Sequence, residues 1–160
     1  MPRANLDGAD RPGADGAEGS AGTLYRLEGV VKTYGSGEML VRAVDGIDIE
    51  ISAGEFVVIV GPSGSGKSTL LQLLGALDRP AGGHVEFEGR DLGRLGDNEL
   101  ADLRLNTLGF VFQQFKLIPT LTARGNVEAA MAPTAVSPVA CSRLALELLE
   151  RVGLGARATH

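Results

Sequence analysis

The sequence predicts a mixed α/β domain. Two stretches, residues 24–34 and 40–51, alternate loosely between apolar and polar side chains, as strands do. Residues 56–60 form a continuous apolar run rich in β-branched side chains, the pattern of a strand buried on both faces of a parallel sheet. A glycine-rich loop follows this run directly, and residues 68–77 predict a helix that is apolar nearly all round and therefore buried. Strands that alternate with helices in this way indicate the α/β class.

The remaining elements are shorter. We expect strands at residues 84–88 and 108–112, helices at 98–106, 123–131 and 139–152, and a loop at 113–121.

The N-terminal segment differs in composition from the rest of the chain. Residues 1–22 are rich in Gly, Ala and Asp and hold almost no large apolar side chain. Such a segment buries too little surface to offset the entropy lost on ordering, so we expect a disordered tail. Residues 23–160 fit a single domain. The sequence contains no apolar run of membrane-spanning length.

Charge and cysteine content exclude several classes of function. The formal net charge is −5, and the lysines are Lys32, Lys67 and Lys116. Nucleic acid is therefore not expected as a partner, because binding to a phosphate backbone needs a cationic face. The single cysteine, Cys141, excludes an internal disulfide framework and a cysteine-based zinc site. A reducing cytoplasm fits this composition.

The glycine-rich loop has the spacing Gly-x4-Gly-Lys-Ser of a phosphate-binding loop. Its glycines let the backbone approach a phosphate closely, and successive N–H groups in such a turn form a concave anion site. The helix that starts near Lys67 adds the positive end of its dipole. Lys67 supplies a charge for the β- and γ-phosphates of ATP, and the Ser68 hydroxyl is suited to ligate Mg²⁺. The residues predicted to bind the nucleotide here are Gly61, Pro62, Ser63, Gly64, Ser65, Gly66, Lys67, Ser68 and Thr69.

Four stretches of the chain carry a family resemblance. They are residues 31–35; 61–69 with 77–80; 89–92 with 99–101 and 103–104; and 108–115 with 117–122 and 126–127. Together they resemble the ATP-binding subunits of ABC transporters, a family of P-loop NTPases, and most of all the branch that serves lipoprotein release and macrolide-type export. The last stretch is the most specific, because P-loop kinases and GTPases do not carry it. The resemblance runs over residues 24–160.

The resemblance implies a fold and roles for single residues. The implied fold is an incomplete ABC-type nucleotide-binding domain, with an antiparallel β subdomain, part of a parallel core sheet and the start of a helical subdomain. Tyr34 resembles the aromatic residue that stacks on adenine. Gln113 resembles the glutamine that reaches Mg²⁺ and the attacking water, so Lys67 and Gln113 are the expected catalytic residues and Ser68 and Gln113 the expected metal ligands. Residues 116–121 resemble part of a groove for a helix of the membrane subunit.

The resemblance also implies a function and partners. We expect an ATP-binding subunit that couples ATP binding and hydrolysis to export through an integral-membrane permease. Its cofactors are ATP and Mg²⁺. Family members form homodimers of ATP-binding domains, in the cytoplasm and peripheral to the inner face of the cell membrane. Cargo is recognised by other chains, so this sequence does not name it.

Several motifs of the family do not occur in this sequence. They are the signature Leu-Ser-Gly-Gly-Gln, a Walker B strand that ends in Asp-Glu, and a switch histidine. We therefore expect the N-terminal part of such a domain, which alone binds ATP without hydrolysing it. We also expect marginal stability or aggregation, because residues 56–60 lack neighbouring strands. One alternative is a truncated, non-hydrolysing nucleotide-binding fragment without transport activity. Another is a small P-loop kinase, for which no Arg-rich lid is apparent.

The remaining ionisable residues predict no second site. His84 and His160 have no cluster of partners in the sequence and are expected to be ordinary surface or satisfied residues. The acidic residues Asp91, Asp97, Glu99 and Asp102 are expected to form a solvated helix face.

Overall fold

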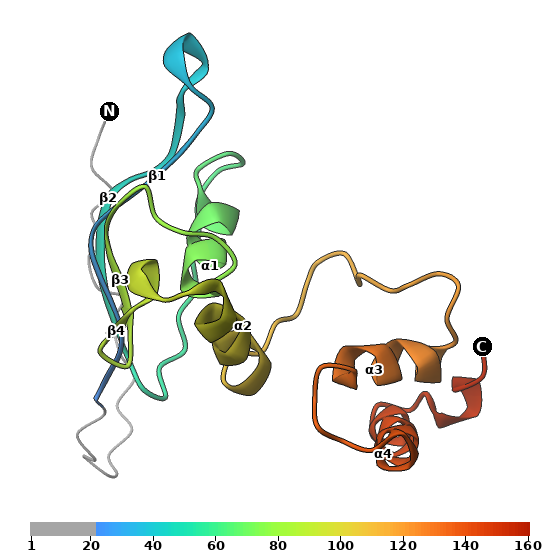
Figure 1. Ribbon diagram of the computed structural model, residues 1–160. Helices are drawn as coiled ribbons and strands as arrows, with labels where there is room; N and C mark the ends of the chain where they lie inside the picture. Colours follow the sequence, from blue (N-terminus) through green and yellow to red (C-terminus); the bar gives the residue numbers. More distant parts are fainter. Residues whose placement is uncertain (1–21) are drawn as a thin grey trace, which may run out of the picture.

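The computed structural model describes residues 22–160, so the predicted tail lies almost wholly outside the described residues and stays a prediction. Four strands and four α-helices follow one another in a mixed order, which confirms the α/β class (Figure 1). Three short 3-10 turns were not predicted. The elements are β1 (Thr23–Tyr34), η1 (Gly37–Met39), β2 (Val41–Ser52), α1 (Lys67–Leu74), β3 (Gly82–Phe87), β4 (Arg90–Asp91), η2 (Leu92–Arg94), α2 (Asp97–Asn106), α3 (Ala123–Met131), α4 (Pro138–Arg151) and η3 (Gly155–Arg157).

The four strands form one antiparallel sheet in the order β2-β1-β3-β4. β1 lies between β2 and β3. Tyr34 of β1 is opposite Val41 of β2, and Tyr25 is opposite Phe87 of β3. The strands predicted at residues 24–34 and 40–51 are thus confirmed with ends shifted by one residue. Bulges interrupt the register between β1 and β2, and bulges of this kind increase the local twist of a strand pair.

One face of this sheet is covered by α1 and α2, and the core lies between them (Figure 1). Tyr25 of β1 donates a hydrogen bond to the carbonyl oxygen of Leu74 at the end of α1, at 2.8 Å. Arg104 of α2 donates to the carbonyl oxygen of Ala76 at 2.6 Å, so both elements hold the C-terminal end of α1. The buried core residues are Leu27, Val30, Val44, Leu70, Leu73, Ala76, Val85, Phe87, Leu92, Leu100 and Leu103.

The helix after the glycine loop is shorter and less buried than its sequence predicts. α1 ends at Leu74, because Gly75 follows it and Ala76 then takes a left-handed conformation with φ 53°. Leu70 and Leu73 face the core, but the side chain of Leu71 is 56% exposed. The helix is apolar nearly all round, as predicted, but the burial inferred from this is wrong for the face of α1 that carries Leu71.

The two strands expected to begin a parallel core sheet are not formed in the described chain. Residues 56–60 and 108–112 lie outside regular secondary structure. Phe56 is 91% exposed and Val60 is 79% exposed, so the apolar run is not a core strand here. A strand needs a neighbour for its backbone N–H and C=O groups. Among residues 22–160, every paired strand belongs to the antiparallel sheet.

The helices α3 and α4 form a separate group at the C-terminal end, joined to α2 by a long segment (Figure 1). Ala145, Leu149 and Ala158 are buried in this group. The backbone N–H of Ala123 donates to the carbonyl oxygen of His160 at 2.7 Å, which closes the group on itself. No helix in the described part of the chain has both the length and the apolar character needed to cross a membrane.

Candidate functional site

The glycine loop connects the exposed run at residues 56–60 to the start of α1. Gly64 and Gly66 have φ angles of 79° and 88°, in the left-handed region where a residue without Cβ is strongly favoured. Gly66 is the N-cap residue of α1. A Cβ on Gly66 would collide with the backbone carbonyl oxygen of Ala43 in β2. The loop therefore rests directly on the antiparallel sheet, and only glycine allows this approach.

The side chain of Lys67 folds back over the loop. Its Nζ donates to the carbonyl oxygens of Gly61 at 2.9 Å and Pro62 at 2.7 Å, and lies 3.5 Å from Oγ of Ser65. These acceptors are neutral, and a phosphate oxygen is a stronger acceptor for an ammonium group. The ammonium group of Lys67 thus lies against the curved backbone of the loop. A positive charge in this position suits an anionic ligand.

The N-terminus of α1 lacks a side-chain cap. The N–H of Leu70 is the first to bond within the helix, to the carbonyl oxygen of Gly66 at 2.8 Å. The N–H groups before it have no acceptor inside the helix. By contrast, Thr122 caps α3 and Ser137 caps α4 through their hydroxyl groups. Free N–H groups and the positive dipole end together favour a phosphate at the start of α1.

Tyr34 lies close to the glycine loop through the strand register. It is opposite Val41, two residues from Ala43, whose carbonyl oxygen meets Gly66. Two residues along and one strand across correspond to about 8 Å between the Cα atoms of Tyr34 and Ala43. The side chain of Tyr34 is 41% exposed. An exposed aromatic side chain this close to the strand residue that supports Gly66 is available to a nucleotide base.

Two charged residues contact Tyr34, and the sequence did not predict them as part of the site. Asp78, just after α1, accepts a hydrogen bond from the Tyr34 hydroxyl at 3.0 Å. Lys32 donates to Asp78 at 2.6 Å, and its Nζ lies 5.1 Å from the centre of the Tyr34 ring. Partial burial by itself raises the pKa of Asp78, but hydrogen bonds from Lys32, the N–H of Arg79 and Tyr34 outweigh it and lower that pKa below 3.8. Asp78 is therefore ionised at neutral pH.

Gln113 is not brought to the loop by the described chain. It follows Phe110 and Phe112, whose rings stack at 5.8 Å, in an exposed segment. Phe110 rests against Gly75, where a Cβ would come within 2.5 Å of the ring. Among the hydrogen bonds of residues 22–160, none joins Gln113 to Ser68 or Lys67. The same residues contain no group of three His, Cys, Asp or Glu side chains suited to a metal ion, so the Mg²⁺ ligands stay a prediction.

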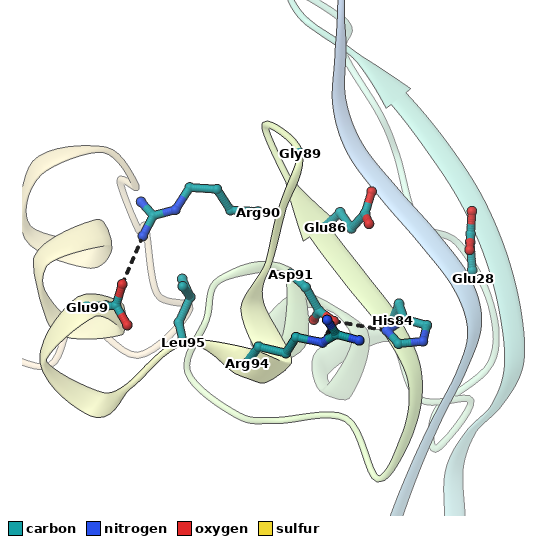
Figure 2. Close-up of a pocket in the computed structure, with 9 residues that line it drawn as sticks. All are labelled: Glu28, His84, Glu86, Gly89, Arg90, Asp91, Arg94, Leu95 and Glu99. Carbon is teal, nitrogen blue, oxygen red and sulfur yellow. Dashed lines mark hydrogen bonds and ion pairs between the residues drawn. The ribbon is translucent and has the colours of Figure 1, made fainter.

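A hollow of about 610 Å³ lies elsewhere, between β3, β4 and η2 (Figure 2). None of its lining residues belongs to the glycine loop. His84 pairs with Asp91, with Nδ1 and Oδ2 2.9 Å apart, and Arg94 contacts the same oxygen at 3.3 Å. The lining residues are Glu28, His84, Glu86, Gly89, Arg90, Asp91, Arg94, Leu95 and Glu99.

The expectation of a solvated acidic helix face was therefore partly wrong. Asp91 is in β4, not in a helix, and its side chain is only 16% exposed. Asp97 and Glu99 of α2 are exposed but paired, with Arg79 at 2.7 Å and Arg90 at 3.3 Å. Pairing across 18 and 9 residues of sequence is not visible in the local charge pattern.

Comparisons with known proteins agree with this geometry. The sequence model of the family described as "ABC transporter" matches residues 44–160. An uncharacterized ABC transporter ATP-binding protein of Thermotoga maritima is 51% identical over 137 residues, 86% of this chain and 58% of the relative. A macrolide export ATP-binding/permease protein, MacB 1/2, of Paracoccus denitrificans is 48% identical over 137 residues, 86% of this chain and 20% of the relative.

Solved structures give the same answer for the fold. The post-hydrolysis dimer of the ATP-binding cassette MJ0796, bound to ADP and Pi, superposes with a TM-score of 0.76 at 42% identity, over 86% of this chain and 61% of that chain. The chain thus spans less than two thirds of the relatives it matches. The antiparallel sheet with its helices is accordingly an incomplete ABC nucleotide-binding domain, as the sequence predicts. This chain belongs to the ABC transporter family, as part of its ATP-binding component.

Proposed function

We propose that residues 61–69 bind the phosphates of ATP. The observation that carries the proposal is the ammonium group of Lys67, held over the loop carbonyls at the uncapped start of α1. Two left-handed glycines shape the backbone around it. In this proposal Lys67 contacts the β- and γ-phosphates, and the N–H groups at the start of α1 contact their oxygens.

Three further roles complete the proposed nucleotide site. Tyr34 stacks on the adenine ring, which its exposure and its distance from the loop support. Ser68 and Gln113 are the proposed ligands of Mg²⁺, whose preferred donors are oxygen atoms such as these side chains carry. The metal would neutralise phosphate charge during ATP hydrolysis. Gln113 would also orient the attacking water, once its segment lies nearer the loop than it does here.

We further propose that the ATP-binding component works in export through an integral-membrane permease, as a homodimer at the inner face of the cell membrane. The names of several similar proteins, macrolide export ATP-binding/permease proteins, support this role. The segment at residues 116–121, proposed as part of the permease groove, exposes Leu117 and Ile118. Exposed apolar side chains of this kind are typical of interaction surfaces.

The chain by itself is proposed to bind ATP without turning it over. In residues 22–160, no carboxylate pairs with or accepts a hydrogen bond from residues 61–69. Hydrolysis needs a positioned water and a complete set of charges around the transferred phosphate. This observation supports the alternative of a non-hydrolysing nucleotide-binding fragment for the isolated chain.

Titration of the chain with ATP and Mg²⁺ in a calorimeter tests the proposal. Lys67→Ala should weaken binding at least about tenfold, because it removes the only side-chain charge over the loop among the described residues. Lys116→Ala is the matched control, since it removes the same charge from the exposed segment after Gln113. Equal affinities for the two variants would refute phosphate binding by this loop. Phosphate release by the wild-type chain, abolished by Lys67→Ala, would refute the proposal that the chain by itself does not hydrolyse ATP.

A further inference from the structure

A cluster of two charged side chains surrounds Tyr34 on the sheet side of the proposed site. We propose that Asp78 and Lys32 act as positioning residues, which hold the Tyr34 ring in place as the platform for the nucleotide base. This inference rests on the proposed function, because it assigns a task to two residues that the family resemblance leaves without one. In this inference the base is recognised by Tyr34 together with Asp78 and Lys32, and not by Tyr34 alone.

The carboxylate of Asp78 is fixed by three donors. Oδ1 accepts from Nζ of Lys32 at 2.6 Å and from the N–H of Arg79 at 2.7 Å. Oδ2 accepts from the hydroxyl of Tyr34 at 3.0 Å. Both oxygens are therefore engaged, and the oxygen that holds the phenol cannot turn away without breaking the other two bonds. This makes Asp78 an anchor for the far end of the Tyr34 side chain.

Lys32 holds the ring from a second direction. Lys32 and Tyr34 are two residues apart on β1, so their side chains leave the same face of the sheet. The side chain of Lys32 is only 13% exposed, and its Nζ sits 5.1 Å from the ring centre, within the range of a cation–π contact. Lys32 occupies one face of the ring, which leaves the opposite face for a stacked base.

The turn that carries Asp78 is itself tied to the rest of the domain. Lys32 also donates to the carbonyl oxygen of Arg79 at 2.8 Å. Arg79 donates to the carbonyl oxygen of Leu95 at 2.9 Å and pairs with Asp97 at 2.7 Å. Asp78, which anchors Tyr34, therefore lies in a turn that other contacts of the domain hold in place.

The same sheet positions both the ring and the glycine loop. Tyr34 is opposite Val41, and Ala43 meets Gly66, so one strand pair sets the distance between base platform and phosphate site. A ring that is held before binding loses less rotamer freedom when a base stacks on it, and this strengthens binding. The benefit applies to the base of the ligand and not to its phosphates.

Two probes separate this inference from the proposed function. Mg²⁺ with ATP reports on base and phosphates together, and Mg²⁺ with inorganic tripolyphosphate reports on the phosphate loop alone. Tyr34→Phe keeps the ring and removes the hydroxyl. We expect it to weaken ATP binding about threefold to tenfold, because a ring that is no longer anchored loses more rotamer freedom when the base stacks on it. Tripolyphosphate should bind as to the wild-type chain.

Asp78→Ala should produce at least the same loss for ATP and none for tripolyphosphate. The double variant Tyr34→Phe/Asp78→Ala should bind ATP no more weakly than Asp78→Ala alone, because both changes break the same bond. Asp45→Ala is the matched control, since Asp45 is an exposed carboxylate of β2 that pairs with Arg42. It should leave the binding of both probes unchanged.

Three outcomes would overturn the inference. If Tyr34→Phe and Asp78→Ala both bind ATP as the wild-type chain does, the ring needs no anchor, although the phosphate loop can still act as proposed. If Asp78→Ala weakens ATP and tripolyphosphate equally, Asp78 acts through the fold alone. If the wild-type chain binds no tripolyphosphate and Lys67→Ala does not change ATP binding, the proposed function fails first and the inference with it.

Discussion

Gly66, at the start of α1, lies directly against the backbone carbonyl oxygen of Ala43 in β2. Gly66 is also left-handed, with φ 88°. The proposed phosphate loop is thus supported by the antiparallel sheet as well as by the helix that follows it. This contact links two parts of the chain that are 23 residues apart in sequence (66 minus 43).

Gly66→Ala should disrupt the loop and destabilise the domain. A side chain here meets both a left-handed backbone, which costs about 1–2 kcal/mol, and a backbone oxygen that cannot move aside without shifting β2. We expect a loss of more than about 2 kcal/mol in the free energy of unfolding, measured by urea denaturation. ATP affinity should fall at least about tenfold, because the N–H groups at the start of α1 lose their alignment.

Gly64→Ala separates the two causes. Gly64 has a similar φ of 79°, but no atom lies within 4 Å of the position that a Cβ would take. Its replacement should cost only the backbone strain of about 1–2 kcal/mol. If both variants lose the same stability, the contact with Ala43 does not support the loop.

Acid should destabilise the β3–β4 region through Asp91. Partial burial alone raises the pKa of Asp91, but hydrogen bonds from His84 and the N–H of Gly93, with the charges of His84 and Arg94, lower it below 3.8. Because the pKa is lower in the folded chain, this carboxylate stabilises the fold above about pH 4, and the contribution is lost as pH falls through the folded-state pKa. The free energy of unfolding should therefore drop more between pH 5 and pH 2 for the wild-type chain than for Asp91→Asn.

The control for this pH dependence is Asp45→Asn. Arg42 and Asp45 form a pair with both side chains more than 60% exposed, at 62% and 63%. Such pairs contribute little to stability. Asp45→Asn should keep the acid sensitivity of the wild-type chain, and a loss of that sensitivity would mean that Asp91 is not its source.

Local patterns predicted most of the antiparallel sheet and all four α-helices. The alternation of apolar and polar residues over 24–34 and 40–51 indicates which face of each strand is exposed to solvent. This signal lies within each strand and needs no distant residue. The apolar runs at residues 56–60 and 108–112 record only a preference for burial. Whether a strand forms there depends on neighbours, and the described chain pairs none with these runs.

The same distinction applies to the site. Gly64 and Gly66 were predicted from spacing, because a phosphate loop needs left-handed glycines at fixed intervals. The contact of Lys32 with Asp78 joins residues 46 apart in the sequence, so no local pattern contains it. Only the shared face of Lys32 and Tyr34, two residues apart on one strand, was available as a signal. The place of Gln113 depends on a segment that no local rule fixes.

The exposed run at residues 56–60 should make the chain self-associate. Phe56, Val58 and Val60 are 91%, 64% and 79% exposed, and their backbone has no strand beside it in the described residues. Apolar side chains on unpaired backbone are a template for pairing between copies. In sedimentation velocity, the mean sedimentation coefficient should rise with protein concentration.

The double variant Phe56→Ser/Val58→Thr should reduce that rise and leave ATP affinity unchanged. Val139→Thr is the matched control, because Val139 is an exposed apolar residue of α4, at 83%, and its backbone lies within a helix. Scattered exposed side chains of this kind are normal on a protein surface. If Val139→Thr reduces the association as much, or if the double variant does not reduce it, residues 56–60 are not the cause.

Trypsin should cut the described part of the chain first after Lys116. Residues 113–121 are all exposed and lie outside helices and strands, where backbone enters a protease most easily. Trypsin also cuts after arginine, but the arginines of the described chain lie in helices, strands or 3-10 turns, apart from Arg79, which is held by Leu95 and Asp97. Mass spectrometry at early times should therefore find a fragment that begins at Leu117, and Lys116→Gln should slow its release. Because the β1–α2 and α3–α4 parts each have their own buried residues, the two pieces should keep their circular dichroism signals after the cut. An earlier cut inside α2 or β1 would contradict this division of the chain.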